Sequence, residues 1–590
     1  MEPMKTFKPL QLLSLPGLGD LKCSGLVLIV GPNSSGKSQL LQDIYQRISG
    51  EPRSLVVASN IRVEKPEFQP FMEYLEQEGY FETIIDDAGN AQWRPLKTYA
   101  GSGQAVNQIN QQQAQQWHGS HGSDPEPHAK RRSEFLNYFG RLMVTGLFLE
   151  RRLTALQLVG NIDFQNQSPQ HDLHALYVDD EARIHLLNEM MESFGKAIWP
   201  DNSRGNGICL KVSDGGVVPS AEDRLSAKKM ANYRQLESEG DGLKSYVATC
   251  VALLLGRRPV CLIDEPEMCL HPPQAYNLGR FIGRHGRSVD AVTFVSTHSS
   301  QILRGVVQTT KDIQIVRMTR KAGEFQAHLV PADVLTEALA KPTVRAESVL
   351  DGIFAQSVVV VESDGDRLVY QTVWDTLASE LRSDIHVATV GGIGGIADTC
   401  KLYQTLGIPV AVMADLDMIT NPRLLRRVLE AIAEKDEIEQ LCNEAVSVME
   451  KIKNLAPQVD IDEIRNHLSD LVASDADWVV DADIRARREL NNMAKLLDRV
   501  GRLKRGGIKA FPPEVRDPLQ DLVDQLSRYG IFLVPVGELE GWLVDAGIAE
   551  SKENKWAWAN AAANYVQLQG AQAGDIWDFV RSAGNFLRRQ

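Results

Sequence analysis

Apolar runs that end in polar or acidic residues recur along the chain, and segments with helical periodicity separate them. In the first half, strands are predicted at residues 24–30 (SGLVLIV), 259–264 (PVCLID) and 291–297 (AVTFVST). Helices are predicted directly after the first strand and, at residues 272–286, between the other two. Continuous apolar strands that alternate with helices are typical of an α/β sheet.

The second half repeats this alternation and predicts a second α/β sheet. Four strands are expected, at residues 357–362, 385–390, 409–417 and 530–543. Between about residues 421 and 505 the pattern becomes helical and highly charged, which predicts a helical insertion. The expected fold is therefore α/β, with a first domain over residues 1–335 and a second over residues 336–590.

One segment of the first domain does not follow the α/β pattern. Residues near 100–133 are dominated by Gln, Gly, Ser, His and Asn, a composition that cannot bury enough surface to fold alone. We expect a polar, partly disordered excursion there. His118, His121 and His128 fall in this excursion, and we expect them to be solvated side chains rather than metal ligands.

Composition narrows the class of protein. Of the 590 residues, 43% are hydrophobic and 24% are charged, as in soluble globular proteins. No apolar run approaches the roughly 20 residues of a membrane helix. The N-terminus lacks an apolar signal core and the seven cysteines include no CxxC pair, so a cytoplasmic protein is expected. The net charge of −14 argues against a general nucleic-acid coat, but it allows a local basic groove or bridging metal ions.

The stretch GPNSSGKS (residues 31–38) matches the phosphate-binding pattern G-x-x-x-x-G-K-[ST] and stands between a predicted strand and a predicted helix. In this setting glycines let backbone N–H groups approach phosphates, Lys37 reaches the outer phosphates and Ser38 can bind Mg²⁺. The alternative, a Gly-Ser turn with an exposed lysine, is disfavoured by the flanking strand and helix. The candidate ATP-binding residues here are Gly31, Asn33, Gly36, Lys37, Ser38 and Gln39.

Two adjacent acids end the strand predicted at residues 259–264. Asp264 is expected to bind Mg²⁺ together with Ser38, and Glu265 is the candidate base for the attacking water. His298 follows the next strand, where it can contact the γ-phosphate. A lone histidine is more often a core or loop residue, but the position of His298 one strand after the acids favours a contact with the γ-phosphate.

These motifs together resemble an ABC-type ATPase head of the SMC and RecF kind, over roughly residues 1–331. The resemblance is carried by the phosphate-binding loop, DEPEMCLHP (264–272) and STHSS (296–300). It implies a head that dimerises around two ATP molecules, each completed by a signature motif from the other subunit. The candidate signature is LESEGDGLKSYV (236–247), in which Ser238 and Gly240 would contact ATP. It departs from the usual L-S-G-G-Q form, which leaves its contact residues open.

Carboxylates also gather after the strands of the second domain. Glu362 and Asp366 lie in VVVVESDGDR (358–367), and Asp415 and Asp417 end the strand predicted at 409–417. Residues two apart on a strand point to the same side, and parallel strands end on one rim of their sheet. Four close carboxylates repel, and all-oxygen ligands suit Mg²⁺ or Mn²⁺, so we expect a divalent metal site. Solvated loop acids are the alternative.

A strand that ends in Glu, followed by a strand that ends in D-x-D, resembles the TOPRIM domain of topoisomerases, primases and OLD nucleases. The resemblance covers roughly residues 346–590. The usual E-G-x-x-D turn reads ESDGD here, with Ser363 at the glycine position and the glycine moved to Gly365. Asp364 is expected to be a helix N-cap or a bystander. The altered turn leaves the local geometry open.

An ABC-type head followed by a TOPRIM domain resembles the architecture of the OLD (overcoming lysogenization defect) family. The resemblance implies an ATP-regulated nuclease, often in bacterial defence against phage. It also implies a further acid and a lysine that complete a two-metal site with Glu362 and Asp415. Glu538 or Glu540, predicted to end a strand, is the candidate acid, and Lys555 or Lys504 is the candidate lysine.

The expected function is metal-dependent hydrolysis of DNA phosphodiesters by a homodimer or larger homo-oligomer, with ATP as a switch. Two alternatives stay open. The same site could cut RNA, such as tRNA, or the chain could be a nucleotide-gated scaffold with inactive TOPRIM acids that holds a partner protein. An operon-encoded protein or RNA partner is also left open.

Overall fold

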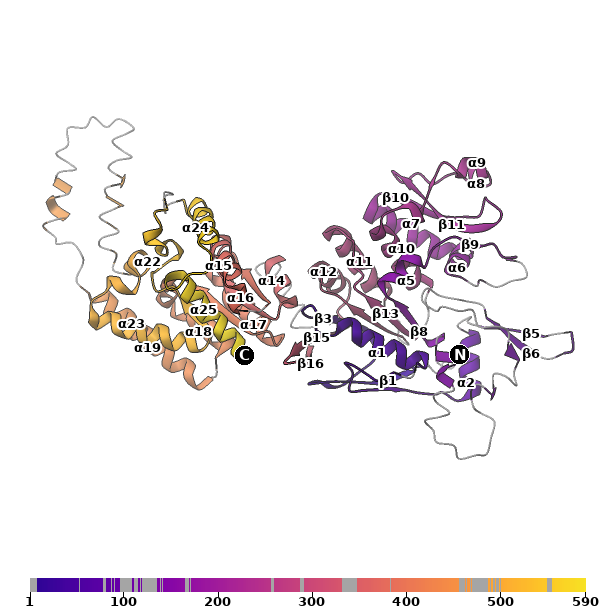
Figure 1. The fold of residues 1–590 in the computed structure, drawn as a ribbon, viewed down its shortest axis with the longest axis horizontal. Coiled ribbons are helices and arrows are strands. Elements are labelled where there is room, and N and C mark those ends of the chain that lie inside the picture. Colours follow the sequence, from indigo (N-terminus) through magenta and orange to yellow (C-terminus); the bar gives the residue numbers. More distant parts are fainter. Residues whose placement is uncertain are drawn as a thin grey trace, which may run out of the picture. The chain divides into compact units, whose positions relative to one another are not determined.

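The chain divides into two compact units, Met1–Thr336 and Glu337–Gln590 (Figure 1). Both are α/β, which confirms the predicted fold class. None of the helices in the described ranges combines the length and apolar character that crossing a bilayer requires. The computed structural model describes residues 8–51, 53–77, 81–85, 87–89, 91–95, 109–110, 115–116, 118, 135–137, 139–140, 142–164, 169, 171–255, 259–286, 291–331, 347–381, 384–433, 435–455, 462, 464–466, 468–469, 487–488, 490–491, 494, 498, 500–548 and 554–590.

The first unit is built on a six-stranded sheet in the order β16-β15-β3-β14-β13-β8. All neighbours pair in parallel except β16, which joins the edge in the antiparallel direction. Every residue of β14 is buried, including the polar Thr293 and Ser296, as expected for a central strand covered on both faces, and the predicted strand is confirmed. The strands are β3 (Gly25–Val30), β8 (Val144–Leu147), β13 (Val260–Asp264), β14 (Val292–Ser296), β15 (Ile313–Lys321) and β16 (Glu324–Val330).

Helices cover this sheet. In α1, the buried residues Leu40, Leu41, Ile44 and Ile48 recur at helical spacing and face the sheet, which fixes the helix directly behind the phosphate-binding loop. The helices of this unit are α1 (Lys37–Ser49), α2 (Phe68–Gln77), α5 (Leu149–Thr154), α6 (Asp172–Val178), α7 (Asp180–Phe194), α8 (Ala221–Arg224), α9 (Ala227–Met230), α10 (Asp241–Leu255), α11 (Pro272–His285) and α12 (Ser300–Thr309).

Three smaller sheets complete the first unit, in the orders β2-β1-β4, β5-β6-β7 and β10-β11-β12 with β9 beside β11. Their neighbours pair in the antiparallel direction. Their strands are β1 (Leu10–Leu15), β2 (Gly19–Leu21), β4 (Asn60–Val63), β5 (Phe81–Ile85), β6 (Ala91–Pro95), β7 (Ile109–Asn110), β9 (Val159–Gly160), β10 (Lys196–Asp201), β11 (Gly207–Asp214) and β12 (Arg234–Gln235).

His118 is the one histidine of the predicted polar excursion that the structure describes, and the prediction of a solvated side chain is wrong for it. Its ring is 4% exposed and packs edge-on against Phe68 and Phe135, while Nε2 lies 2.9 Å from the carbonyl oxygen of Pro66. The aromatic neighbours are distant in sequence, so composition alone could not reveal them. The predictions for His121 and His128 lie outside the described residues.

The second unit is built on a four-stranded parallel sheet in the order β18-β17-β19-β20. The strands are β17 (Ser357–Val361), β18 (Ile385–Thr389), β19 (Val410–Ala414) and β20 (Ile531–Leu533). Each is fully buried or nearly so, as expected for strands covered on both faces. The last strand is much shorter than the predicted 530–543, because the chain leaves the sheet at Val534.

The helices of the second unit are α14 (Glu347–Asp351), α15 (Asp364–Thr376), α16 (Ala378–Leu381), α17 (Ile396–Thr405), α18 (Pro422–Ile432), α19 (Lys435–Lys453), α22 (Arg502–Gly506), α23 (Pro513–Arg528), α24 (Lys555–Gln569) and α25 (Asp575–Arg589). α18, α19 and α22 belong to the predicted helical insertion, of which residues 456–461 and 470–486 lie outside the described ranges. α24 lies against α15 (Figure 1).

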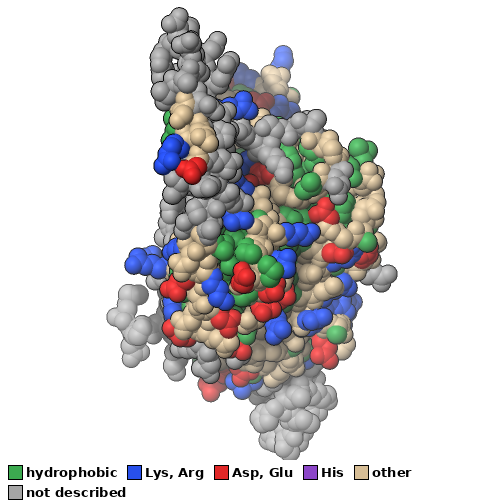
Figure 2. All heavy atoms as spheres, turned by 90° about the vertical axis from the view of Figure 1, so that its left-hand side faces the viewer, with side chains coloured by type: hydrophobic (Ala, Val, Ile, Leu, Met, Phe, Trp, Pro, Cys, Tyr) green, Lys and Arg blue, Asp and Glu red, His purple; other side chains and the backbone are tan. Residues whose placement is uncertain are grey.

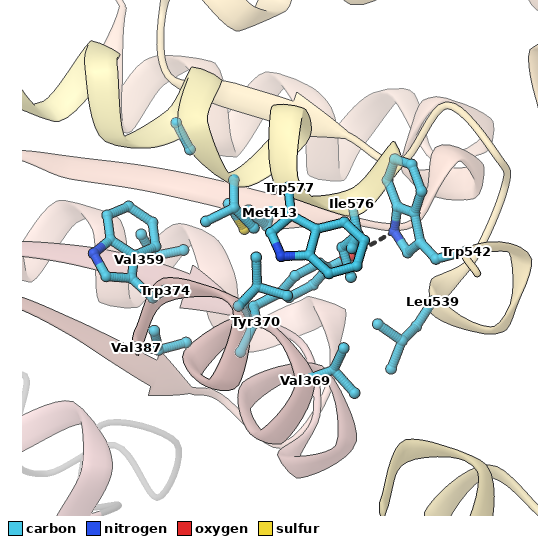
Figure 3. Packing of buried hydrophobic residues seen from close by; sticks show 14 of the residues in the cluster. Val359, Val369, Tyr370, Trp374, Val387, Met413, Leu539, Trp542, Ile576 and Trp577 are labelled. Carbon is cyan, nitrogen blue, oxygen red and sulfur yellow. Dashed lines mark hydrogen bonds between the residues drawn. The ribbon is translucent and has the colours of Figure 1, made fainter. Parts of the chain in front are cut away.

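An aromatic layer fixes the helices of the second unit to its sheet. Figure 3 shows Tyr370, Trp374 and Trp577 gathered in this layer, with Trp542 beside Leu539. Nε1 of Trp542 donates a hydrogen bond to the hydroxyl oxygen of Tyr370 at 3.3 Å. Removing a buried ring of this size costs about 3–5 kcal/mol. The layer therefore holds α15 and the segment after β20 at a fixed separation, and both of these elements carry candidate site acids.

Candidate nucleotide and metal sites

The phosphate-binding loop joins β3 to α1 and requires its glycines. A Cβ atom on Gly31, where φ is +139°, would lie 2.1 Å from the carbonyl oxygen of Met318. At Gly36, where φ is +94°, it would lie 2.8 Å from the ring of Phe325. Nζ of Lys37 donates hydrogen bonds to the carbonyl oxygens of Gly31 and Pro32, each at 2.8 Å. The loop is therefore closed around its own lysine in this structure.

The other candidate residues of this loop have distinct environments. Asn33 is exposed, and Ser38 is half-buried at the start of α1. Nε2 of Gln39 donates a hydrogen bond to Oδ1 of Asp43 at 3.0 Å. The other carboxylate oxygen of Asp43 accepts the backbone N–H groups of residues 56, 57 and 58 at 2.7–3.1 Å. The side chain of Gln39 thus helps to hold Asp43 against the backbone of residues 56–58 in this structure.

The acids after β13 face Lys37 and His298. Oδ1 of Asp264 accepts a hydrogen bond from Oγ of Ser296 at 2.5 Å. Nδ1 of His298 lies 3.5 Å from Oε1 of Glu265, and this contact lowers the pKa of Glu265 and raises that of His298. Burial lowers the pKa of Lys37, which the charges of the neighbouring acids oppose. The structure therefore gathers Lys37, Asp264, Glu265 and His298 into one electrostatic group.

Two further residues of this group were not predicted. Glu267 is buried, and its Oε1 accepts hydrogen bonds from the hydroxyl of Thr297 at 2.7 Å and from the backbone N–H of His298 at 2.8 Å. Burial raises the pKa of Glu267. Arg152, 1% exposed, lies beneath Asp264 and Glu265. Glu267 stands in the quoted DEPE string and could have been singled out there, whereas nothing in the sequence around Arg152 signals its position.

The candidate signature segment (residues 236–247) runs from a short 3₁₀ helix into the first two turns of α10 (Asp241–Leu255). Ser238 ends a short 3₁₀ helix, η1 (Leu236–Ser238), is exposed, and donates a hydrogen bond to the carbonyl oxygen of Gln235 at 2.7 Å. Gly240 is also exposed. Within the described part of the chain, no hydrogen bond or ion pair joins either residue to Lys37.

The acids of the second unit do meet on one rim of its sheet. Glu362 directly follows β17, and Asp415 directly follows the neighbouring parallel strand β19. Asp417 lies in a 3₁₀ helix, η4 (Leu416–Thr420), so the predicted strand does not extend to it. Lys504 on α22 brings the last two acids together, because its Nζ lies 3.2 Å from Asp415 and 3.1 Å from Asp417.

The altered ESDGD turn forms a regular helix start. Ser363, rather than Asp364, is the N-cap of α15, and its hydroxyl accepts the backbone N–H of Asp366 at 3.2 Å. Oδ2 of Asp366 accepts in return from the N–H and hydroxyl of Ser363, which completes a capping box. Asp364 contacts Thr389 and Arg367 instead. Gly365 occupies the first helical turn at an ordinary distance from Ala559, so nothing in the turn requires a glycine there.

Glu538 is the N-cap of a 3₁₀ helix, η6 (Leu539–Gly541), and Glu540 lies within it, so the prediction that they end a strand is wrong. The tight turn still brings both toward Lys555, whose Nζ lies 3.3 Å from Glu538 and 3.4 Å from Glu540. Glu540 is 3% exposed, and its Oε2 has no hydrogen-bond partner among the described residues. An unsatisfied buried carboxylate oxygen is costly unless a ligand binds it.

Burial and mutual repulsion dominate the electrostatics of this rim. Burial raises the pKa of Asp415 to about 7, Asp366 contributes to the rise, and Lys504 opposes it. Burial likewise raises the pKa of Glu362 and of Asp366. Six carboxylates, those of Glu362, Asp366, Asp415, Asp417, Glu538 and Glu540, interact here with two ammonium groups, those of Lys504 and Lys555.

The donor set fits a hard divalent cation in chemistry and charge. It offers only oxygen ligands, an excess of negative charge and one orphaned carboxylate oxygen. As placed, no three His, Cys, Asp or Glu side chains of the described residues converge on one point as ligands. Lys504 and Lys555 contact the carboxylates instead, so a cation would have to displace an ammonium group.

Basic side chains do not form a stripe on the visible surface. Figure 2 shows Lys and Arg interspersed with Asp and Glu around exposed hydrophobic side chains, among the described residues of that face. A protein that coats nucleic acid presents an extended basic surface. Contacts to a polyanion on this face would therefore depend on local groups.

Comparison with known protein families identifies the class of each unit. Residues 211–304 match a family described as an AAA domain, putative AbiEii toxin, Type IV TA system. Residues 353–417 match the TOPRIM domain of overcoming lysogenization defect protein-like sequences, a span that contains Glu362, Asp366, Asp415 and Asp417. The chain is thus an ATPase domain joined to a TOPRIM domain. Its TOPRIM domain is of the OLD-like kind, as the resemblance predicted.

Solved structures resemble parts of the chain. The SMC head bound to the C-winged helix domain of ScpA is 10% identical, with 56% of this chain and 99% of that chain covered and a TM-score of 0.31. The SMC head domain from Thermotoga maritima is 13% identical, with 55% and 98% covered and a TM-score of 0.28. The C-terminal region of the Burkholderia pseudomallei OLD protein is 18% identical, with 40% and 98% covered and a TM-score of 0.18. No curated protein matches the chain.

Proposed function

We propose that this chain is an ATP-regulated nuclease that hydrolyses DNA phosphodiesters with Mg²⁺ or Mn²⁺. The observation that carries the proposal is the meeting of six carboxylates and two lysines on the rim of the TOPRIM sheet. Carboxylates gathered at this density repel one another, and a cation-dependent phosphodiester site gives a reason for that cost. The family match over residues 353–417 supports the same class of site.

Each residue of the site has a distinct task in this proposal. Glu362, Asp366, Asp415 and Asp417 would hold the cation, with Glu540 or Glu538 at a second position. A bound cation supplies Lewis-acid stabilisation and makes a water molecule more acidic. Lys555, which is exposed, and Lys504 can bind non-bridging phosphate oxygens once they leave the carboxylates. The aromatic layer beneath α15 keeps the acids at a fixed separation.

ATP would act at the first unit as a switch for this nuclease. The loop of residues 31–38 would bind the phosphates, with Ser38 and Asp264 holding Mg²⁺ and Lys37 leaving its carbonyl partners for the outer phosphates. Glu265 would accept a proton from water, and the 3.5 Å contact between its Oε1 and Nδ1 of His298 supports a joint role of the two residues. Two heads would dimerise so that Ser238 and Gly240 of one chain reach the nucleotide of the other.

The direct test is incubation of the purified protein with plasmid, linear DNA and tRNA, in Mg²⁺ or Mn²⁺, with and without ATP. Cutting of DNA that changes with nucleotide supports the proposal, and Glu265→Gln should alter only the nucleotide dependence. Equal cutting with and without ATP would remove the switch. Cutting of tRNA alone would reassign the substrate to RNA. Folded protein that cuts neither would favour a scaffold.

A role in defence against phage is also proposed, because the OLD family resemblance implies it. Expression of the protein in a bacterial host should lower phage plaque counts, and Asp415→Ala should restore them. Equal protection by wild type and variant would separate the defence role from the nuclease. Failure of both to protect, with DNA cutting intact in vitro, would overturn the defence role alone.

A further inference from the structure

Arg152 is a buried arginine that faces the backbone of the ATPase site rather than a ligand. It lies on α5, directly after β8, and is 1% exposed. Its guanidinium donates to the carbonyl oxygens of Leu147 at 2.6 Å, Asp264 at 2.5 Å and Glu265 at 2.9 Å, and to Oγ of Ser245 at 2.8 Å. A planar guanidinium with donors in a fixed fork can tie several elements together in this way.

The burial of this charge requires an explanation, because an uncompensated buried cation costs several kcal/mol. The carbonyl oxygens and the nearby acids supply the compensation. One of the bonded carbonyls belongs to Glu265, whose φ is +45°, a left-handed conformation that costs a non-glycine residue about 1–2 kcal/mol. Arg152 therefore helps to hold the strained backbone from which the candidate base is presented.

The same guanidinium also reaches α10 (Asp241–Leu255), the helix whose first two turns belong to the candidate signature segment. Ser245, in the second turn of α10, is fully buried and accepts from Nε of Arg152. The first turn of α10 makes a second close approach to the acidic loop, because a Cβ atom on Gly242 would lie 2.3 Å from the carbonyl oxygen of Cys269. The start of α10 thus approaches the loop that carries Asp264 and Glu265 directly at Gly242, and it is connected to that loop through Arg152 at Ser245.

We propose that Arg152 and Ser245 are positioning residues that couple the start of α10 to the backbone of Asp264 and Glu265. A ligand that shifts the segment of residues 236–242 moves α10, and the rigid Ser245–Arg152 link carries that movement to the candidate base. Hydrolysis of ATP then depends on the state of the signature segment, although neither positioning residue touches the nucleotide. This inference rests on the proposed hydrolysis of ATP by the first unit.

The test compares Arg152→Lys and Ser245→Ala with a matched control on the same helix. Thr249 is also fully buried on α10, and among the described residues its hydroxyl bonds within the helix, to the carbonyl oxygen of Ser245 at 2.9 Å. Thr249→Val therefore removes a buried hydroxyl of α10 and leaves the Arg152 link intact. Each full-length protein is assayed for the Kd of ATP, the kcat of ATP hydrolysis and the thermal unfolding midpoint.

Ser245→Ala should lower kcat roughly tenfold with a Kd for ATP within about twofold of wild type, because misplacing a catalytic group slows the chemical step. Arg152→Lys should lower kcat at least as much, and the double variant should lose no more than Arg152→Lys alone, since both act through one link. Thr249→Val should keep the wild-type kcat.

Two results would overturn this inference and leave the proposed ATP switch standing. In the first, wild type hydrolyses ATP and Ser245→Ala has the same kcat. In the second, Thr249→Val loses as much kcat as Ser245→Ala. Wild-type protein without ATP hydrolysis overturns this inference and the proposed switch together.

Discussion

Nζ of Lys504 lies 3.2 Å from Oδ2 of Asp415, and the same ammonium group contacts Asp417 at 3.1 Å. The two carboxylates that follow β19 are thus paired with a lysine at the position where a divalent cation would bind them. The ammonium group and the cation compete for the same oxygens. Lys504 therefore lowers the repulsion among the acids when no metal is bound, at the expense of metal affinity.

Replacing Lys504 by Met should strengthen metal binding, because the cation then has no competitor for Asp415. The measurement is the rise in unfolding midpoint of the second unit on adding MnCl₂ to protein freed of metal by EDTA. A tenfold gain in affinity adds about 1.4 kcal/mol of metal-dependent stability. Lys509 is an exposed lysine five residues away, and Lys509→Met is the control. An equal response of the two variants to Mn²⁺ would contradict the competition.

The two acids of the ESDGD turn should differ sharply in their effect on cutting. The charge of Asp366 adds to the rise that burial causes in the pKa of Glu362 and Asp415, whereas Asp364 contacts Thr389 and Arg367. Asp366→Asn keeps an oxygen for the capping box but removes the charge, and we expect it to reduce DNA cleavage at least about a hundredfold. Asp364→Asn, the matched control, should stay within about threefold of wild type. Comparable losses in both would place the metal site elsewhere on the rim.

The sequence predicted the site residues whose positions follow from the ends of strands. Each parallel strand ends at the same rim, so Glu362 and Asp415 could be placed together from the apolar runs that precede them. The roles of Lys504 and Lys555 could not be fixed in the same way, because each reaches the acids from a helix that the strand pattern does not place. Likewise Arg152 meets Asp264 across 112 positions, through contacts that no local pattern encodes.

Short helical turns explain the local errors. Glu538 and Glu540 were expected on a strand, but the chain leaves β20 after three residues and turns into η6. The period of two along a strand and the tight 3₁₀ turn both bring alternate residues near one partner, here Lys555. The correct grouping was therefore reached with an incorrect secondary structure.

Ser363 should stabilise the second unit through its capping box. Replacing an N-cap serine by alanine costs about 1 kcal/mol, whereas glycine costs only a few tenths. We expect Ser363→Ala to lower the free energy of unfolding by about 1 kcal/mol, and Ser363→Gly, which restores the glycine of the usual E-G-x-x-D turn, to lower it less. Urea unfolding followed by the fluorescence of the buried tryptophans measures both. A larger loss for glycine than for alanine would show that the hydroxyl does not cap α15.

His118 should make the stability of the first unit depend on acidity. Burial lowers the pKa of His118 from 6.5 to about 4, and the charge of Lys65 adds to the decrease. The unfolded state therefore takes up a proton first as the pH falls, so the stabilisation is complete above about pH 6.5 and is lost toward pH 4. Phenylalanine fits the aromatic surroundings and cannot titrate, so the stability of His118→Phe should fall less between pH 7 and 4.

The stabilities of wild type and His118→Phe are compared by urea unfolding across this pH range, with His328→Phe on the surface strand β16 as the control. Parallel stability curves for wild type and His118→Phe would contradict a buried, neutral His118.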